Sequence, residues 1–167
     1  MGMSKKQSRE LAIATKFIQL YNGKLKSIRL GNPVEKEPDV ICSDGFSIEV
    51  TTIYDNKSQA KYYWEDMKGI VNPFQKRKLR LTPEEQLVQT IGFKLAKLEE
   101  GLYSGVDETK IFLLCYSESP LFGAKEATRV KSQYQPFKQD NFFTNYFFET
   151  WLMWWQGGDT YGISKLE

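Results

Sequence analysis

The sequence contains no histidine, and this absence removes several kinds of catalytic chemistry. A Ser–His–Asp triad or a Cys–His pair cannot be built, and neither can a zinc site with histidine ligands. Cys42 and Cys115 are too few for a four-sulfur zinc site. Both stand in apolar, strand-like runs, so we expect them to be reduced and buried. Chemistry based on carboxylates, lysine, tyrosine and ions such as magnesium remains.

Long apolar runs and a strong net charge are also lacking. Residues 1–7 are polar, and no stretch is long enough to cross a membrane, so we expect a cytoplasmic protein without a membrane partner. The net charge of +2 says little about partners. A length of 167 residues with 41% hydrophobic and 26% charged residues is ordinary for a globular protein, and predicts a single domain over residues 1–167.

Residues 37–51 are the most informative stretch and predict two short strands joined by a tight turn. The segment Ser43-Asp44-Gly45 suits a three-residue loop, a type I turn followed by a left-handed glycine. Apolar residues alternate on both sides of this loop, as in strands with one buried face. They are Val40, Cys42, Phe46, Ile48 and Val50.

The register set by this loop places Asp39 opposite Glu49, on the same face as Glu37 and Thr51. Opposed side chains lie about 4.5–5.5 Å apart, and like charges there are destabilising. Such a pair either raises the pKa of one acid or binds a cation. Two alternatives remain open. A two-residue loop would put the two acids on opposite faces, and an ordinary surface hairpin would simply point acids to water.

The same residues resemble the motif of the PD-(D/E)XK nuclease superfamily, the fold of many restriction endonucleases. Pro38-Asp39 is followed after nine residues by Glu49-Val50-Thr51, where Thr51 occupies the position of the motif lysine. The resemblance covers roughly residues 8–116. It implies an α/β fold with a central mixed β-sheet flanked by helices, and an endo- or exonuclease that hydrolyses DNA with Mg²⁺ or Mn²⁺. Asp39, Glu49 and the backbone carbonyl of Val50 would hold the metal.

Two predicted helices contribute further candidate residues. The helix over residues 4–22 carries Glu10 at the head of its apolar stripe, and the resemblance implies that Glu10 supports the metal. A solvated first-turn acid is the alternative. The helix over residues 82–100 begins with a capping box and ends at Gly101. Lys94 lies at the edge of its apolar face, while Lys97 is expected to face solvent.

Lys94 is therefore the candidate to replace the missing lysine of the motif. The resemblance extends to members of the superfamily in which the lysine has moved to this helix. The alternative is that Lys94 only extends its apolar stem along the surface and keeps its amine in water.

The remaining elements are less regular. Strands are expected over residues 24–30, 46–53 and 110–116, the last covered on both faces. Residues 141–155 are rich in aromatics, and we expect a helix there, followed by a C-terminal hairpin. Most of this aromatic surface should be core, and part of it is the candidate contact for a homodimer.

A basic cluster in residues 75–80 is the candidate nucleic-acid interface. It consists of Lys76, Arg77, Lys78 and Arg80. Aromatic residues lie nearby in the sequence, and basic residues mixed with aromatics suit phosphate contact and base stacking. A solvated loop is the alternative, because four charges are a small cluster.

Three functions remain open at this stage. The favoured one is a magnesium-dependent phosphodiesterase acting on DNA. An inactive nucleic-acid- or protein-binding module on the same fold is the main rival, because Thr51 lacks the charge of a lysine. An RNA-cleaving enzyme using the same site is the third.

Overall fold

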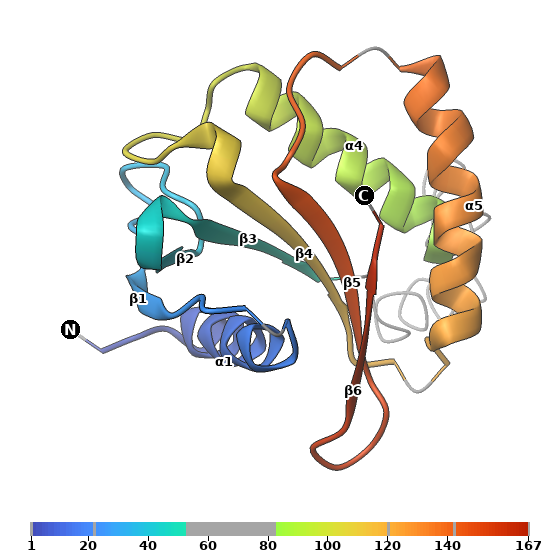
Figure 1. Cartoon of the computed structure of the whole chain (residues 1–167), viewed down its shortest axis with the longest axis horizontal. Helices are drawn as coiled ribbons and strands as arrows, with labels where there is room; N and C mark the ends of the chain where they lie inside the picture. The colour runs from blue at the N-terminus through green and yellow to red at the C-terminus, as the bar shows by residue number, and fades with distance from the viewer. Residues whose placement is uncertain (1, 22, 53–82, 120, 142, 167) are drawn as a thin grey trace, which may run out of the picture.

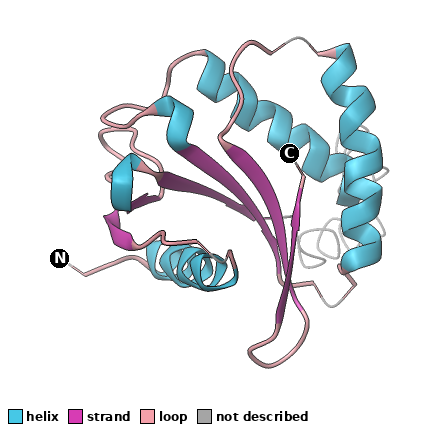
Figure 2. Cartoon of the chain, in the orientation of Figure 1, coloured by secondary structure: helices cyan, strands magenta, loops and turns pink. Residues whose placement is uncertain are grey.

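The computed structural model describes residues 2–21, 23–52, 83–119, 121–141 and 143–166, and in them a six-stranded mixed sheet lies between helices (Figures 1 and 2). The expected α/β class with a central mixed sheet flanked by helices is confirmed. The strands are β1 Ser27–Leu30, β2 Val40–Cys42, β3 Ser47–Thr52, β4 Ile111–Ser117, β5 Glu149–Trp155 and β6 Tyr161–Lys165. The α-helices are α1 Lys5–Leu20, α4 Pro83–Glu99 and α5 Ala124–Asp140.

The strands follow one another across the sheet in chain order, from β1 to β6. The first three pair antiparallel, β3 with β4 and β4 with β5 pair parallel, and β6 closes the far edge antiparallel to β5. Parallel neighbours need a crossover, and α5 lies in the connection between β4 and β5. The three central strands β3, β4 and β5 therefore form the rigid middle of the molecule.

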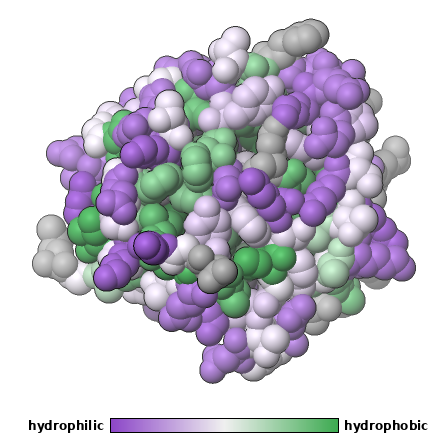
Figure 3. Space-filling model, viewed as in Figure 1, coloured by the Kyte–Doolittle hydropathy of each residue, from purple (hydrophilic) through white to green (hydrophobic). Residues whose placement is uncertain are grey.

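Each face of the sheet has its own apolar core. Helix α1 packs on one face, and α4 and α5 pack on the other (Figure 1). Strand β4 is buried along its whole length, because alternate residues enter the two cores. This confirms the strand predicted to be covered on both faces. Hydrophilic side chains occupy much of the periphery in Figure 3. None of the described helices is long and apolar enough to cross a membrane.

The predicted hairpin register is correct. Val40 pairs with Ile48, and the Cys42 N–H donates to the Phe46 carbonyl at 2.8 Å. The loop differs in one detail, since Asp44 (φ 59°) and Gly45 (φ 78°) are both left-handed, not Gly45 alone. Aspartate tolerates this conformation better than most residues with a side chain. The three-residue loop length, and with it the register, is unaffected.

Helices α1 and α4 begin where their sequence signals indicate. Ser4 caps α1 in a capping box with Gln7, one residue from the predicted start. Helix α4 starts at Pro83, and the chain leaves it at Gly101, whose φ of +66° favours glycine. The apolar stripe of α4 is almost completely buried. It consists of Leu87, Ile91, Leu95 and Leu98.

The prediction for residues 141–155 is wrong in part. Residues 149–155 form β5, which pairs with β4 and places alternate side chains in the two cores. The helix lies earlier, in α5, where only Ala127, Val130 and Tyr134 are buried and the apolar signal is correspondingly weak. A C-terminal hairpin is present, but its first strand is β5, which lies in the segment predicted to be helical.

One prediction lies outside the described residues. It is the basic cluster of Lys76, Arg77, Lys78 and Arg80 with the aromatic residues near it.

The backbone of Gly31 packs closely against the backbone of the segment that carries Asp39. Its N–H donates to the Asp39 carbonyl at 2.9 Å, and a Cβ on Gly31 would lie 1.6 Å from the Pro38 carbonyl oxygen. We therefore expect Gly31→Ala to lower the free energy of unfolding by about 1–3 kcal/mol, since the backbone must move. Urea denaturation measures this change. Gly2→Ala is the control, because nothing lies within 4 Å of that position. Equal stability of both variants would contradict the close approach.

Candidate functional site

Asp39 lies directly before β2, and its carboxylate reaches across to β3. Its Oδ2 atom accepts a hydrogen bond from the Val50 N–H at 2.8 Å. The bond is made to a backbone group of the central sheet, so it fixes the carboxylate relative to β3 and to Glu49, the residue before Val50. The Pro38-Asp39 and Glu49-Val50 halves of the motif are thus joined by a specific contact.

Glu49 projects from β3 toward α4 and is only 4% exposed. Its Oε1 atom accepts a hydrogen bond of 2.7 Å from the Lys94 ammonium. The amine of Lys94 is thus directed at the acid and not simply at water. Lys94 of α4 thus brings a positive charge to Glu49, and its part in any reaction stays a prediction.

Lys97 is also at the site, which corrects the expectation that it faces solvent. Its Nζ atom lies 3.6 Å from Glu49 Oε1 and 4.5 Å from the centre of the Tyr103 ring. At about 100° per residue, Lys97 lies about 60° from Lys94 around α4. That difference is small compared with the reach of a lysine side chain, whose stem bends back along the surface.

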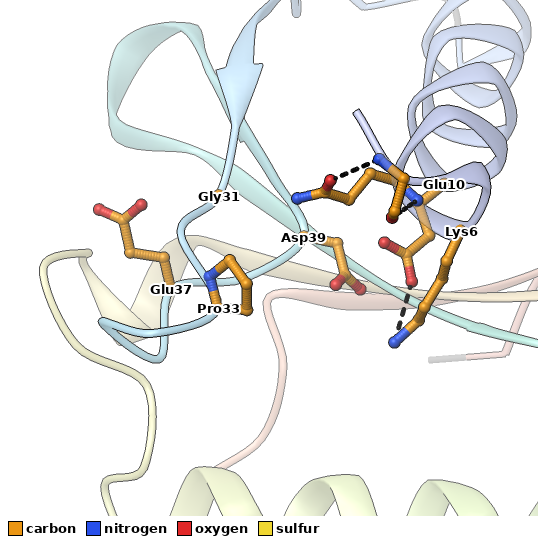
Figure 4. Close-up of a pocket in the computed structure, with 8 residues that line it drawn as sticks. Lys6, Glu10, Gly31, Pro33, Glu37 and Asp39 are labelled. Carbon is orange, nitrogen blue, oxygen red and sulfur yellow. Dashed lines mark hydrogen bonds and ion pairs between the residues drawn. The ribbon is translucent and has the colours of Figure 1, made fainter. Parts of the chain in front are cut away.

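Glu10 enters the site from α1. Its side chain is 13% exposed and lies 3.5 Å from the Lys6 ammonium. Figure 4 shows the Glu10 and Asp39 carboxylates pointing toward one another. They line a cavity of about 320 Å³ between the start of α1 and the segment around Gly31. Glu10 is therefore not a fully solvated acid, and its predicted support of a metal ion stays a prediction.

The clustered acids disturb one another's ionisation. Burial, and then the Glu49 and Glu10 carboxylates, raise the pKa of Asp39 to about 7, although the Val50 N–H acts in the opposite direction. Burial is also the main cause that raises the pKa of Glu10, and the ammonium of Lys6 opposes it. A site that resists its own negative charge in this way is one that a cation stabilises.

Tyr103 completes the surroundings of Glu49 and was not found from the sequence. It is 3% exposed, and burial followed by the Glu49 carboxylate raises its pKa. Its hydroxyl lies near Glu49 without a hydrogen bond of good geometry. The residue follows the end of α4 in an irregular segment, so no periodicity or motif pointed to it.

Glu37 lines the same cavity as Asp39 and Glu10, but its carboxylate does not join theirs, contrary to the predicted face. Its carboxylate accepts hydrogen bonds of 2.7 and 2.9 Å from Arg29 and one of 2.8 Å from the Asn32 N–H. These bonds lower the pKa of Glu37 to about 2. Figure 4 shows it turned away from Asp39. Thr51 is buried in β3 opposite Cys115, where its hydroxyl brings no charge.

The carboxylate oxygens at the site are ligands of the kind that a hard cation prefers. In the described part of the chain, no three acidic or cysteine side chains gather closely enough to make a complete cage. Mg²⁺ does not need one, because it keeps several waters and usually binds one or two carboxylates together with substrate phosphate. Asp39 and Glu49 match this pattern, with Glu10 nearby. The role predicted for the Val50 carbonyl stays a prediction.

The raised pKa of Asp39 makes stability depend on pH. Asp39 favours the folded state fully below its ordinary pKa of 3.8, and this contribution is lost as the pH rises through about 7. Without divalent metal, the free energy of unfolding of the parent should therefore fall relative to that of Asp39→Asn between pH 4.5 and pH 8. We expect a change of at least one pKa unit, about 1.4 kcal/mol.

Urea denaturation at the two pH values, in the presence of EDTA, measures this difference. The comparison with Asp39→Asn cancels the opposite contributions of Glu37 and Asp107, whose pKa values are lowered. If the free energy of unfolding depends on pH in the same way in both proteins, the pKa of Asp39 is not raised in the folded state.

Comparisons with known proteins do not identify a family for this chain. Neither a protein-family model, nor a curated protein, nor a solved structure matches the chain.

Proposed function

We propose that this chain is a metal-dependent phosphodiesterase, an endo- or exonuclease acting on DNA. One observation carries the proposal. Lys94 reaches from α4 to within 2.7 Å of Glu49, and so brings a positive charge to a pair of acids whose motif lacks its lysine. The charge that Thr51 cannot supply thus has a source at the same place.

The order of elements also supports a restriction-endonuclease-like fold. Helix α1 is followed by three antiparallel strands, then by α4, then by β4 parallel to β3. This agrees with the order of helix, strand hairpin, helix and strand that the PD-(D/E)XK resemblance implies. In the proposed fold, Asp39 lies directly before the second strand, Glu49 lies on the third, and the lysine comes from α4 after them.

The residues divide the hydrolysis of a phosphodiester among them. Asp39 and Glu49 would hold the metal ion, with Glu10 adding negative charge beside them. When bound, such an ion activates a water and neutralises charge on the phosphate. Lys94 is placed to donate a hydrogen bond to that water and orient it toward phosphorus. The water oxygen then bonds to phosphorus and gives up its protons as the ester P–O bond breaks. One proton goes to the leaving oxygen, which becomes a hydroxyl, and the other is released to solvent.

A second candidate function has an observation in its favour. Glu49 Oε1 already lies near two ammonium groups, those of Lys94 and Lys97. These charges compensate the buried acid without any metal, as expected for an inactive binding module that keeps the fold. Cleavage assays with Mg²⁺ or Mn²⁺ on single- and double-stranded DNA and RNA separate the DNase, the RNase and the inactive module.

Metal binding tests the acidic pair directly. We expect the parent to bind Mn²⁺ in a calorimetric titration and the double variant Asp39→Asn, Glu49→Gln to lose this binding, because both carboxylates would contact the ion. Glu37→Gln is the matched control, since Glu37 belongs to the same segment but pairs with Arg29. Equal affinity in the parent and the double variant would rule out a metal site at these acids.

Turnover tests the lysine. We expect Lys94→Met to lower the cleavage rate at least about a hundredfold, the lower end for loss of a proton-transfer or charge-stabilising group. Binding of Mn²⁺ should persist. Lys110→Met is the control, because Lys110 is tied to the Asp44 carbonyl at 3.1 Å, away from the acids. If Lys94→Met cleaves as fast as the parent, the displaced-lysine account fails; if the parent cleaves nothing, the inactive module is the better account.

A further inference from the structure

Lys97 has no part in the chemistry assigned so far, although it lies at the site. Its 3.6 Å distance from Glu49 Oε1 is an ion pair too long for a good hydrogen bond. Among the described residues, the contacts of its ammonium are with Glu49 and with the Tyr103 ring, and neither is a hydrogen bond. The side chain is 36% exposed, compared with 25% for Lys94. Lys97 is thus the more accessible and less committed of the two lysines.

Tyr103 holds the ammonium of Lys97 in place. The Nζ atom lies 4.5 Å from the ring centre, a distance at which the face of the ring attracts a cation. The ring itself is fixed, because it is buried in the core between the sheet and α4, and it packs edge-on against Phe147. Lys97 is therefore positioned by a rigid platform and is not a freely rotating surface lysine.

The charges at the site indicate what this ammonium would bind. A divalent cation on Asp39 and Glu49 would take over the Glu49 oxygen and repel Lys97. The displaced ammonium needs another anion, and its ring platform keeps it beside the acids. The group that accompanies a metal ion of this kind in such a site is a phosphate, and lysine binds phosphate as a point charge.

We propose that Lys97 contacts a non-bridging phosphate oxygen of a nucleic-acid backbone, and that Tyr103 is the residue that positions it. This inference rests on the proposed function, because it assumes that nucleic acid enters the same site. Lys94, with its direct bond to Glu49, acts on turnover, whereas Lys97 acts on binding of the backbone.

The test measures binding under conditions without cleavage. Fluorescence anisotropy with labelled 20-nucleotide DNA, single- and double-stranded, in Ca²⁺ over a series of salt concentrations, gives the slope of log affinity against log salt. We expect Lys97→Met to reduce the magnitude of this slope by about 0.7–0.9, as for one lost phosphate contact, and to weaken binding about tenfold at 0.1 M salt. Lys97→Arg should keep the slope of the parent.

Lys110→Met is the matched control, because Lys110 also lies over an aromatic ring, 5.2 Å from the centre of Phe46, but away from the acids. It should leave the slope unchanged. Tyr103→Phe keeps the ring and should also keep the slope, whereas Tyr103→Leu removes the platform and should behave as Lys97→Met. A circular-dichroism melt checks that Tyr103→Leu remains folded; Tyr103→Phe and the lysine variants decide the matter if it does not.

The outcomes separate this inference from the proposed function. An unchanged slope in Lys97→Met overturns the phosphate contact, even if the parent cleaves DNA. The parent could bind DNA and cleave nothing, while Lys97→Met shows the expected change in slope. This result overturns the proposed nuclease activity and keeps the contact between Lys97 and phosphate. A parent that binds neither form of DNA overturns the contact as well.

Discussion

The charge of Glu49 is the constraint around which the candidate site is arranged. Glu49 stands on β3, in the middle of the sheet, and is almost inaccessible to water. A buried carboxylate is costly unless a positive charge and hydrogen bonds compensate it. In this structure the compensation comes from α4, through the direct bond of Lys94 and the longer contact of Lys97. The position of α4 over the sheet and the ionisation of the site are thus coupled.

Asp39 and Glu10 make this arrangement unusual for a purely structural ion pair. The carboxylates of Asp39 and Glu10 face the region of Glu49. The pKa of Asp39 is raised mainly by burial and then by the Glu49 and Glu10 carboxylates. A structure that needed only to neutralise Glu49 would gain nothing by adding acids beside it. Shifted pKa values of this kind cluster at functional sites, and this supports the proposal that the acids receive a cation.

The two lysines and the acids suggest an exchange of partners as the physical basis of the proposed activity. Without metal, the ammonium groups satisfy Glu49. With metal, they would be released toward the water and the phosphate that accompany the ion. Tyr103 and the cores on either side of the sheet hold these groups in place during the exchange, so little of the fold has to move.

Local sequence signals determined much of this protein. The length of the loop at residues 43–45 set the hairpin register, and the alternation and capping patterns located β3, β4, α1 and α4, because these signals act over a few residues. They also singled out Asp39, Glu49, Glu10 and Lys94. Only the tertiary structure decided the rest. Whether Lys97 reaches Glu49 depends on how α4 crosses the sheet, and the place of Tyr103 depends on the packing of the chain after α4. The aromatic segment at residues 149–155 became a strand because it pairs with β4, a partner more than thirty residues away that no local pattern reveals.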